Sequence, residues 1–197
     1  MSENQRWRPT PHVDLPGDHL FLLVGLPAVG KLSVATEIGR RTGAIVVDNH
    51  LVNNAVFVPM GLGRGLGVDL ADTDALRGRV YDVVVESTLL APPGLSHVFT
   101  VWLPDGPGNA AHVDRLRTLA GRRGARFVPI WLTASPEALL ARIDAPGRAE
   151  RSKLTDREVL RDLLELPVLS PPEDAITLDL STMGPEKAAA EVLDALT

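Results

Sequence analysis

The stretch that decides the fold reads HLFLLV-GLPAVG-KLSVATEIGRRT and spans residues 19–42. Its first six residues, His19–Val24, form a short apolar run, which is typical of a strand buried on both faces of a parallel sheet. Glycines open and close the next six residues, and Lys31 begins a segment with apolar residues at helical spacing. We therefore predict a buried strand, a tight loop and a helix, in that order.

The spacing G-x-x-x-x-G-K between this strand and this helix indicates a phosphate-binding loop. Glycines let the backbone wrap around a phosphate chain, successive N–H groups make an anion nest, and the helix N-terminus adds its positive end. Lys31 supplies a positive charge for the β- and γ-phosphates of ATP. A glycine-rich turn with a solvated lysine is the alternative. The residues assigned to nucleotide binding are Gly25, Leu26, Pro27, Ala28, Val29, Gly30, Lys31, Leu32 and Ser33.

The metal site departs from the usual pattern of such loops. A serine or threonine normally follows the lysine and ligates Mg²⁺, but here Leu32 follows and Ser33 comes next. We expect either that Ser33 ligates Mg²⁺ or that phosphates, waters and a carboxylate hold the ion. The Walker B carboxylate, the acidic residue that assists metal binding in such proteins, is not evident from the sequence. Asp105 follows the third predicted strand.

Apolar strands alternate with amphipathic helices along the whole chain. This order predicts a parallel sheet with right-handed crossovers and helices on both faces, a three-layer α/β fold. The predicted strands are 19–24, 44–47, 97–103, 126–132 and 175–180. Pro129 predicts a position near an edge or a bulge for the fourth strand. The predicted helices are 31–42, 49–58, 73–90, 109–123, 135–143, 155–165 and 185–196.

The helix predicted over 73–90 is expected to turn one apolar face inward, with Leu76, Val80, Val83 and Val84 on it. We predict an N-terminal arm over 1–18 and a single domain over 19–197, with a glycine-rich acceptor-side flap over 59–72 and a basic lid over 144–153.

Two segments carry a resemblance to a known family: GLPAVGKLSVA at 25–35 and VVDNHLVNN at 46–54. From Gly25 onward, and over roughly 20–180, the chain resembles bacterial P-loop proteins of the AAA-type ATPase/kinase group. These are described as shikimate-kinase-like or chloramphenicol-phosphotransferase-like small-molecule kinases. The resemblance implies a P-loop NTPase fold with a five-stranded parallel sheet, of the nucleoside-monophosphate-kinase/shikimate-kinase type. The leucine after the lysine looks like a trait of this family.

Asp48 ends the second predicted strand, where ligands bind in parallel α/β sheets. Asp48, Asn49 and His50 are therefore expected in the same crevice as the phosphate loop. The resemblance implies that Asp48 orients the acceptor hydroxyl and takes its proton, which makes it a catalytic residue. Alternatively, Asp48 and Asn49 cap the next helix. For Asn49, His50 and Asn53, substrate contact and structural hydrogen bonding both stay open.

Phosphoryl transfer spreads negative charge over the transferred group, so arginines are expected nearby. The resemblance places an acceptor-binding arginine at Arg77, with Arg79 as the alternative register, and Arg142 on the adenine or the phosphates. It also places Arg148 and Lys153 on the lid, with Arg148 as a catalytic residue at the transferring phosphate. The alternative for these groups is a solvated basic surface.

Composition narrows the classes of partner. The net charge of −5 argues against a broad nucleic-acid surface, and no apolar run reaches the ~20 residues that a membrane span needs. We expect a cytoplasmic protein without disulfides, since it contains no cysteine, and count a homodimer among the expected assemblies.

The function predicted is an ATP-dependent kinase acting on a hydroxyl of a small metabolite or antibiotic-like acceptor. The alternatives are a regulatory ATPase without such an acceptor and a nucleoside or nucleotide kinase.

Overall fold

A five-stranded parallel sheet forms the centre of the computed structural model, which describes residues 13–143 and 156–197. The strands are β1 His19–Val24, β2 Ile45–Val47, β3 His97–Val101, β4 Arg126–Thr133 and β5 Ile176–Asp179. Their order is β2-β3-β1-β4-β5, and every neighbouring pair is parallel. The predicted α/β fold with five parallel strands is confirmed.

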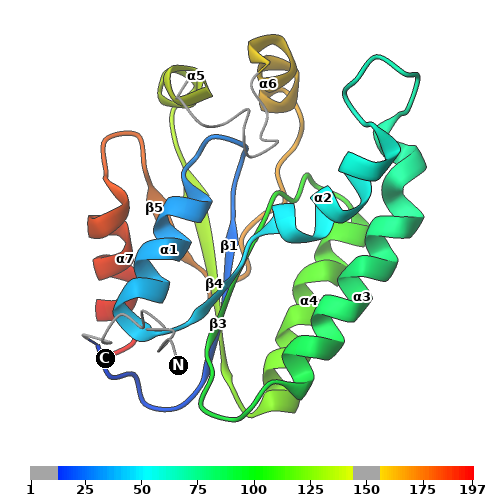
Figure 1. The fold of residues 1–197 in the computed structure, drawn as a ribbon. Helices are drawn as coiled ribbons and strands as arrows, with labels where there is room; N and C mark the ends of the chain where they lie inside the picture. Colours follow the sequence, from blue (N-terminus) through cyan, green and yellow to red (C-terminus); the bar gives the residue numbers. More distant parts are fainter. Residues whose placement is uncertain (1–12, 144–155) are drawn as a thin grey trace, which may run out of the picture.

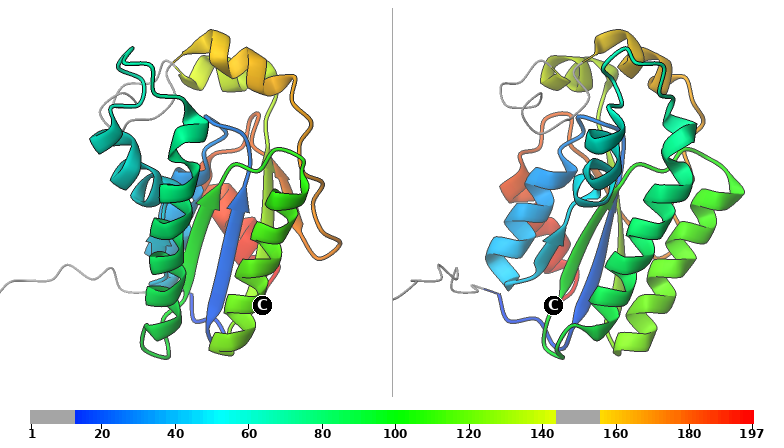
Figure 2. Two further views of the ribbon diagram at one scale, coloured as in Figure 1. Left: turned by 90° about the vertical axis from the view of Figure 1, so that its right-hand side faces the viewer. Right: turned by 45° about the vertical axis from the view of Figure 1, so that its right-hand side comes forward.

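Helices cover both faces of the sheet (Figures 1 and 2). They are α1 Lys31–Thr42, α2 Asn49–Met60, α3 Asp74–Leu90, α4 Pro107–Arg123, α5 Pro136–Ile143, α6 Arg157–Leu164 and α7 Pro185–Asp194, with a 3₁₀ turn η1 Leu70–Thr73. Helices α1 and α7 lie on one face, and α3 and α4 on the other, while α2, α5 and α6 lie near the carboxyl ends of the strands.

Strand β1 supplies the core of both layers because it is buried along its whole length. Phe21 and Leu23 point into the cluster with α1, α5, α6 and α7, whereas Leu20 and Leu22 point into the cluster with α3 and α4. Side chains alternate across a strand, so a continuous apolar run fills both sides of the sheet. The loop that follows β1 therefore starts from the most deeply anchored strand.

The predicted inward face of α3 is confirmed for Val84 and wrong for Leu76 and Val83. Tyr81, Val84 and Val85 pack against the core, but Leu76 and Val83, which were predicted to face inward, are 40% and 61% exposed. Apolar residues occupy two sides of this helix, and periodicity alone did not distinguish the side that meets the sheet.

Pro129 was predicted to lie near an edge or a bulge, and β4 is the strand next to the edge strand β5. Pro129 is in register with Leu22 of β1, and pairing with β5 begins one residue later, at Ile130. The sheet therefore has no β5 partner beside Pro129, and a residue without an N–H is tolerated there.

The glycine-rich segment begins later than predicted, since α2 continues through Pro59 and ends at Met60 with Gly61 as its C-cap. Turns follow before η1 begins. At the first described residue, the Val13 N–H donates to the Arg41 carbonyl at 3.1 Å. This part of the predicted arm therefore packs on the domain. The predicted lid over 144–153 lies outside the described residues.

No helix in the described part of the chain combines the length and the apolar character needed to cross a membrane.

Arg123 joins the C-terminal end of α3 to the turn that leads into β3. Its side chain is only 4% exposed, and it donates hydrogen bonds to the carbonyls of Thr88, Ala91, Pro92 and Leu95. These carbonyls belong to a helix end and a turn, where the backbone lacks regular partners. One guanidinium therefore supplies hydrogen-bond donors to a helix end and to the turn after it, and the Thr88 carbonyl also accepts the Ala91 N–H.

We predict that Arg123→Met lowers the free energy of unfolding by about 3 kcal/mol, because it removes the hydrogen bonds of one guanidinium to four carbonyls at the end of α3 and in the turn after it. Urea unfolding measures the change. The matched control is Arg122→Met, since Arg122 is the preceding residue of α4 and is exposed. An Arg123→Met protein as stable as this control would contradict the assigned role.

Candidate active site

The loop between β1 and α1 is held by close backbone contacts. The Gly25 N–H donates to the Val101 carbonyl of β3 at 3.3 Å. A Cβ at Gly25 would lie 2.5 Å from the Leu132 carbonyl oxygen and 2.9 Å from Val29 Cγ1, so only glycine fits there. Gly30 has a φ of 110°, in the region that favours glycine. A positive φ just before a helix N-terminus fits the backbone that an anion nest requires.

Lys31 lies across this loop. Its Nζ donates to the carbonyls of Gly25 at 2.6 Å and Leu26 at 2.9 Å. The alternative of a solvated lysine therefore does not describe this side chain. A phosphate chain in the loop would lie within reach of the same ammonium group, which would exchange carbonyl partners for phosphate oxygens.

Arg142 connects the loop to the residue that follows the edge strand β5. Its guanidinium donates to the Val29 carbonyl at 3.2 Å and to the Leu180 carbonyl, just after β5, at 2.5 Å. The side chain thus contacts the main chain of the phosphate loop, a contact that was not predicted. Its predicted contact with adenine or phosphate stays a prediction.

The residues after Lys31 give limited support for direct metal ligation. Ser33 is exposed on the first turn of α1, and Leu32 is half-buried. Among the described residues, no group of three or more histidine and acidic side chains is placed to hold a metal ion. Mg²⁺ commonly keeps several waters and binds through substrate phosphates. The chain therefore fits an ion held mainly by a nucleotide better than one held by a protein cage.

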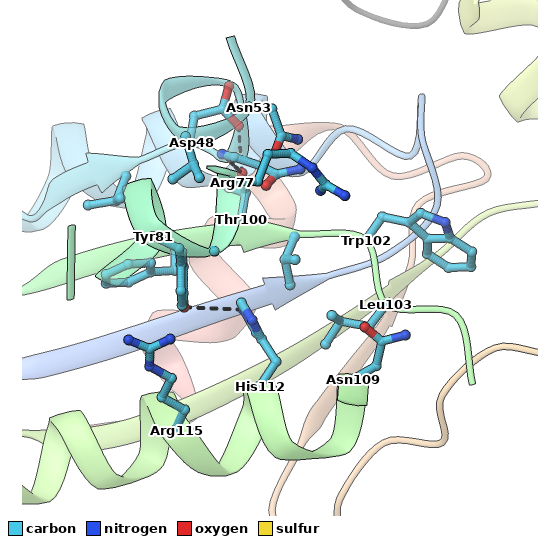
Figure 3. A pocket seen from close by; sticks show the side chains of 16 residues that line it. Asp48, Asn53, Arg77, Tyr81, Thr100, Trp102, Leu103, Asn109, His112 and Arg115 are labelled. Atoms are coloured by element: carbon cyan, nitrogen blue, oxygen red, sulfur yellow. Dashed lines mark hydrogen bonds between the residues drawn. The ribbon is translucent and has the colours of Figure 1, made fainter. Parts of the chain in front are cut away.

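A cavity of about 320 Å³ lies beside the loop, between the end of β3 and helices α2, α3 and α4 (Figure 3). Four of the predicted acceptor residues line it: Asp48, Asn49, Asn53 and Arg77. His50 does not line it, and neither does the phosphate loop. Val101, whose carbonyl accepts from Gly25, does line it, so the loop and the cavity adjoin at the end of one strand.

Two donors hold the carboxylate of Asp48. Thr100 Oγ1 donates to Oδ1 at 2.5 Å, and His50 Nδ1 donates to Oδ2 at 2.9 Å. Asp48 occupies the N-cap position of α2, yet its side chain makes no capping hydrogen bond. The capping alternative is therefore wrong for this side chain, and the carboxylate is oriented at the cavity wall instead.

Thr100 is central to this arrangement, although it is not among the predicted site residues. It is 3% exposed in β3, and its hydroxyl also accepts the Asn49 N–H at 3.2 Å. A lone hydroxyl in an otherwise apolar strand was the available signal. His50 acts here as a partner of Asp48 rather than as a lining residue.

Arg77, rather than Arg79, lines the cavity. Its Nε donates to Thr73 Oγ1 at 3.0 Å, its guanidinium pairs with Asp74, and it lies 5.5 Å from the ring centroid of Phe57. These contacts fix the direction of the guanidinium while leaving it at the cavity surface.

The far wall was not predicted. It includes Tyr81 of α3 and His112 and Arg115 of α4, with the Tyr81 hydroxyl 3.2 Å from His112 Nε2 and Arg115 5.0 Å from the Tyr81 ring centroid (Figure 3). Burial, aided by the charge of Arg115, lowers the pKa of His112 to about 4. Burial also raises the pKa of Tyr81. Both rings are therefore neutral near pH 7.

Together, a buried central strand, a wrapped G-x-x-x-x-G-K loop and a helix in a β2-β3-β1-β4-β5 sheet define a P-loop fold of the small-kinase type. No protein-family model and no curated protein matches the chain.

Solved structures support the same fold. A proposed kinase from Chloroflexus aurantiacus matches with a TM-score of 0.63 at 17% identity, over 92% of this chain and 100% of that one. A gluconokinase from Sinorhizobium meliloti 1021 matches with a TM-score of 0.60 at 16% identity, over 91% of each chain. The APS kinase CysC of Mycobacterium tuberculosis, in complex with AMPPNP and APS, matches with a TM-score of 0.54 at 22% identity, over 92% of this chain and 98% of that one. The fold predicted from the sequence is thereby confirmed.

We predict that Gly25→Ala lowers the free energy of unfolding by about 2 kcal/mol, because the new methyl group overlaps the Leu132 carbonyl. The control is Gly121→Ala in α4, where an added Cβ meets nothing within 4 Å and should stabilise the helix by about 0.5–1 kcal/mol. Chemical denaturation of both variants checks the opposite signs. Equal stability of the two would contradict the close packing at Gly25.

Proposed function

We propose that this chain is an ATP-dependent small-molecule kinase that transfers the γ-phosphate to a hydroxyl of its acceptor. The observation that carries the proposal is the adjacency of a phosphate-type loop and a cavity with an oriented carboxylate, joined at the end of β3. Phosphoryl transfer depends mostly on positioning and on charge stabilisation, and this arrangement offers both.

On the nucleotide side, the main chain of Gly25–Gly30 would bind the phosphates, and Lys31 would neutralise charge on the β- and γ-phosphates. Arg142 would keep the loop in shape through its bond to the Val29 carbonyl. Ser33 is the candidate protein hydroxyl for a Mg²⁺ ion, which would supply positive charge at the phosphates. Arg148 and Lys153 lie outside the described residues, and their lid role belongs to this proposal.

On the acceptor side, Asp48 would accept a hydrogen bond from the reacting hydroxyl and take its proton as the O–P bond forms. Thr100 and His50 would act through Asp48 as positioning residues, since each donates to one of its oxygens. Asn49, Asn53 and Arg77 would bind the remainder of the acceptor, a small molecule with at least one hydroxyl.

The first test of this function uses Asp48→Asn. The acceptor is first found by thermal-shift screening of hydroxyl compounds paired with a non-hydrolysable ATP analogue, because a ligand that binds the native state stabilises it. We expect Asp48→Asn to keep analogue affinity within about threefold and to lose acceptor-dependent ADP release by at least about 100-fold.

Asp114→Asn, at an exposed position of α4, is the matched control and should retain full activity. A regulatory ATPase without an acceptor would show ADP release that no hydroxyl compound increases and that Asp48→Asn barely changes. That result would overturn the kinase proposal.

The second test concerns Thr100. Thr100→Val keeps the side-chain shape but removes the donor to Asp48, so we expect kcat to fall about tenfold with unchanged nucleotide affinity. In the Asp48→Asn background the same change should cost little more, because Thr100 acts through Asp48. Thr118→Val, on α4, serves as the control. Additive losses in the double variant would show that Thr100 does not work through the carboxylate.

A further inference from the structure

Helix α3 presents apolar side chains on two opposite faces. Tyr81 and Val84 pack toward the core, while Leu76, Val83 and Leu90 are 40%, 61% and 75% exposed. A surface helix normally buries one apolar stripe and presents a polar face to water. A second apolar stripe on the solvent side is typical of a contact surface.

The exposed residues form a narrow stripe. Leu76, Val83 and Leu90 are spaced by seven, and Arg79 and Glu86 lie between them, both exposed. At 3.6 residues per turn, these five side chains fall within a sector of about 80°, nearly opposite the face that carries Tyr81. We call these five residues the outer stripe.

The outer stripe is close to symmetric about Val83. The two leucines lie seven residues before and after it, and the charged residues lie four before and three after. A two-fold axis through Val83 would bring an antiparallel copy of α3 into register. It would place Leu76 opposite Leu90 of the second copy, and Arg79 within one residue's rise of Glu86 of the second copy.

Arg79 and Glu86 are the two charged residues of the outer stripe. In the described part of the structure, the side chains of Arg79 and Glu86 make no hydrogen bond and no ion pair. They are seven residues apart, or about 10 Å along the helix axis, which is too far for them to pair with each other. An antiparallel second copy would give each charge an opposite partner, whereas a parallel copy would set like charges side by side.

We propose that the outer stripe is the contact of a homodimer, with a second copy of this chain packed antiparallel against α3. Apolar side chains at the centre and complementary charges beside them make the surface match itself, as an isologous interface requires. The same helix lines the candidate acceptor cavity through Arg77 and Tyr81 on its other face, so the dimer would brace one wall of that cavity.

Charge exchange tests the proposal. Sedimentation velocity at low ionic strength, from about 1 to 200 µM protein, should show a monomer–dimer equilibrium for the natural chain, since a contact of this small size gives modest affinity. Arg79→Glu alone and Glu86→Arg alone should each raise the dimer Kd at least about tenfold, because each makes two like-charge contacts. The double exchange Arg79→Glu/Glu86→Arg should restore the Kd to within about threefold.

The matched control is Arg161→Glu, the same charge change on an exposed position of α6, which should leave the dimer Kd within about twofold. The proposal is overturned if the natural chain stays monomeric throughout, if the double exchange fails to restore association, or if the control weakens the dimer as much as Arg79→Glu does.

Crosslinking gives an independent reading because the chain contains no cysteine. Val83→Cys places one thiol of each copy at the two-fold axis, within the short Cα–Cα range that a disulfide needs. Mild oxidation should convert this variant to a covalent dimer, whereas Glu158→Cys, exposed on α6, should stay monomeric. Equal crosslinking of the two variants, or none in Val83→Cys, would contradict an axis at Val83.

Discussion

The close approach of Gly25 to the Leu132 carbonyl fixes the position of the phosphate-type loop. The loop leaves β1 between the neighbouring strands β3 and β4 and contacts both. The Gly25 N–H donates to the Val101 carbonyl of β3, and the Gly25 Cα, which carries no side chain, lies close to the Leu132 carbonyl of β4. A side chain at this residue would push the loop away from the sheet. Because β1 is buried on both faces, the loop takes its position from the most rigid part of the core.

The candidate acceptor side depends on the same strands. Val101 accepts from the loop, and its predecessor Thr100 donates to Asp48, so two consecutive residues of β3 connect the two halves of the site. Strand β3 lies between β1, which carries the loop, and β2, which carries Asp48. Neighbouring strands lie about 4.8 Å apart, so the sheet itself sets a separation of about 10 Å between the two strand ends. Positioning of this kind needs no contact between the loop and Asp48.

Local patterns explain what could be predicted from the sequence. The strand, loop and helix around Gly25–Lys31 were recoverable because each signal lies within a few residues, and Asp48 was recoverable because a strand end is visible as the end of an apolar run. Whether Arg77 or Arg79 faces the cavity depends on how α3 is rotated about its own axis. That rotation depends on which of its two apolar faces meets the sheet, and the sequence does not distinguish the two faces. The pairing of Tyr81 with His112 joins two helices 31 residues apart in the chain, and no local pattern encodes it.

Burial decides which groups of the cavity carry charge. His112 lies against Tyr81 and near Arg115, and both burial and the neighbouring guanidinium disfavour its protonated form. Arg77 and Arg115 each pair with an acid that is about two-thirds exposed, Asp74 and Asp82, and such surface pairs contribute little binding energy. Both guanidinium groups can therefore exchange these acids for a ligand at small cost. Since His112 and Tyr81 stay neutral near pH 7, a ligand in this cavity would meet neutral hydrogen-bonding rings on one wall and surface ion pairs beside them. Thr100 and His50 hold Asp48 in one orientation.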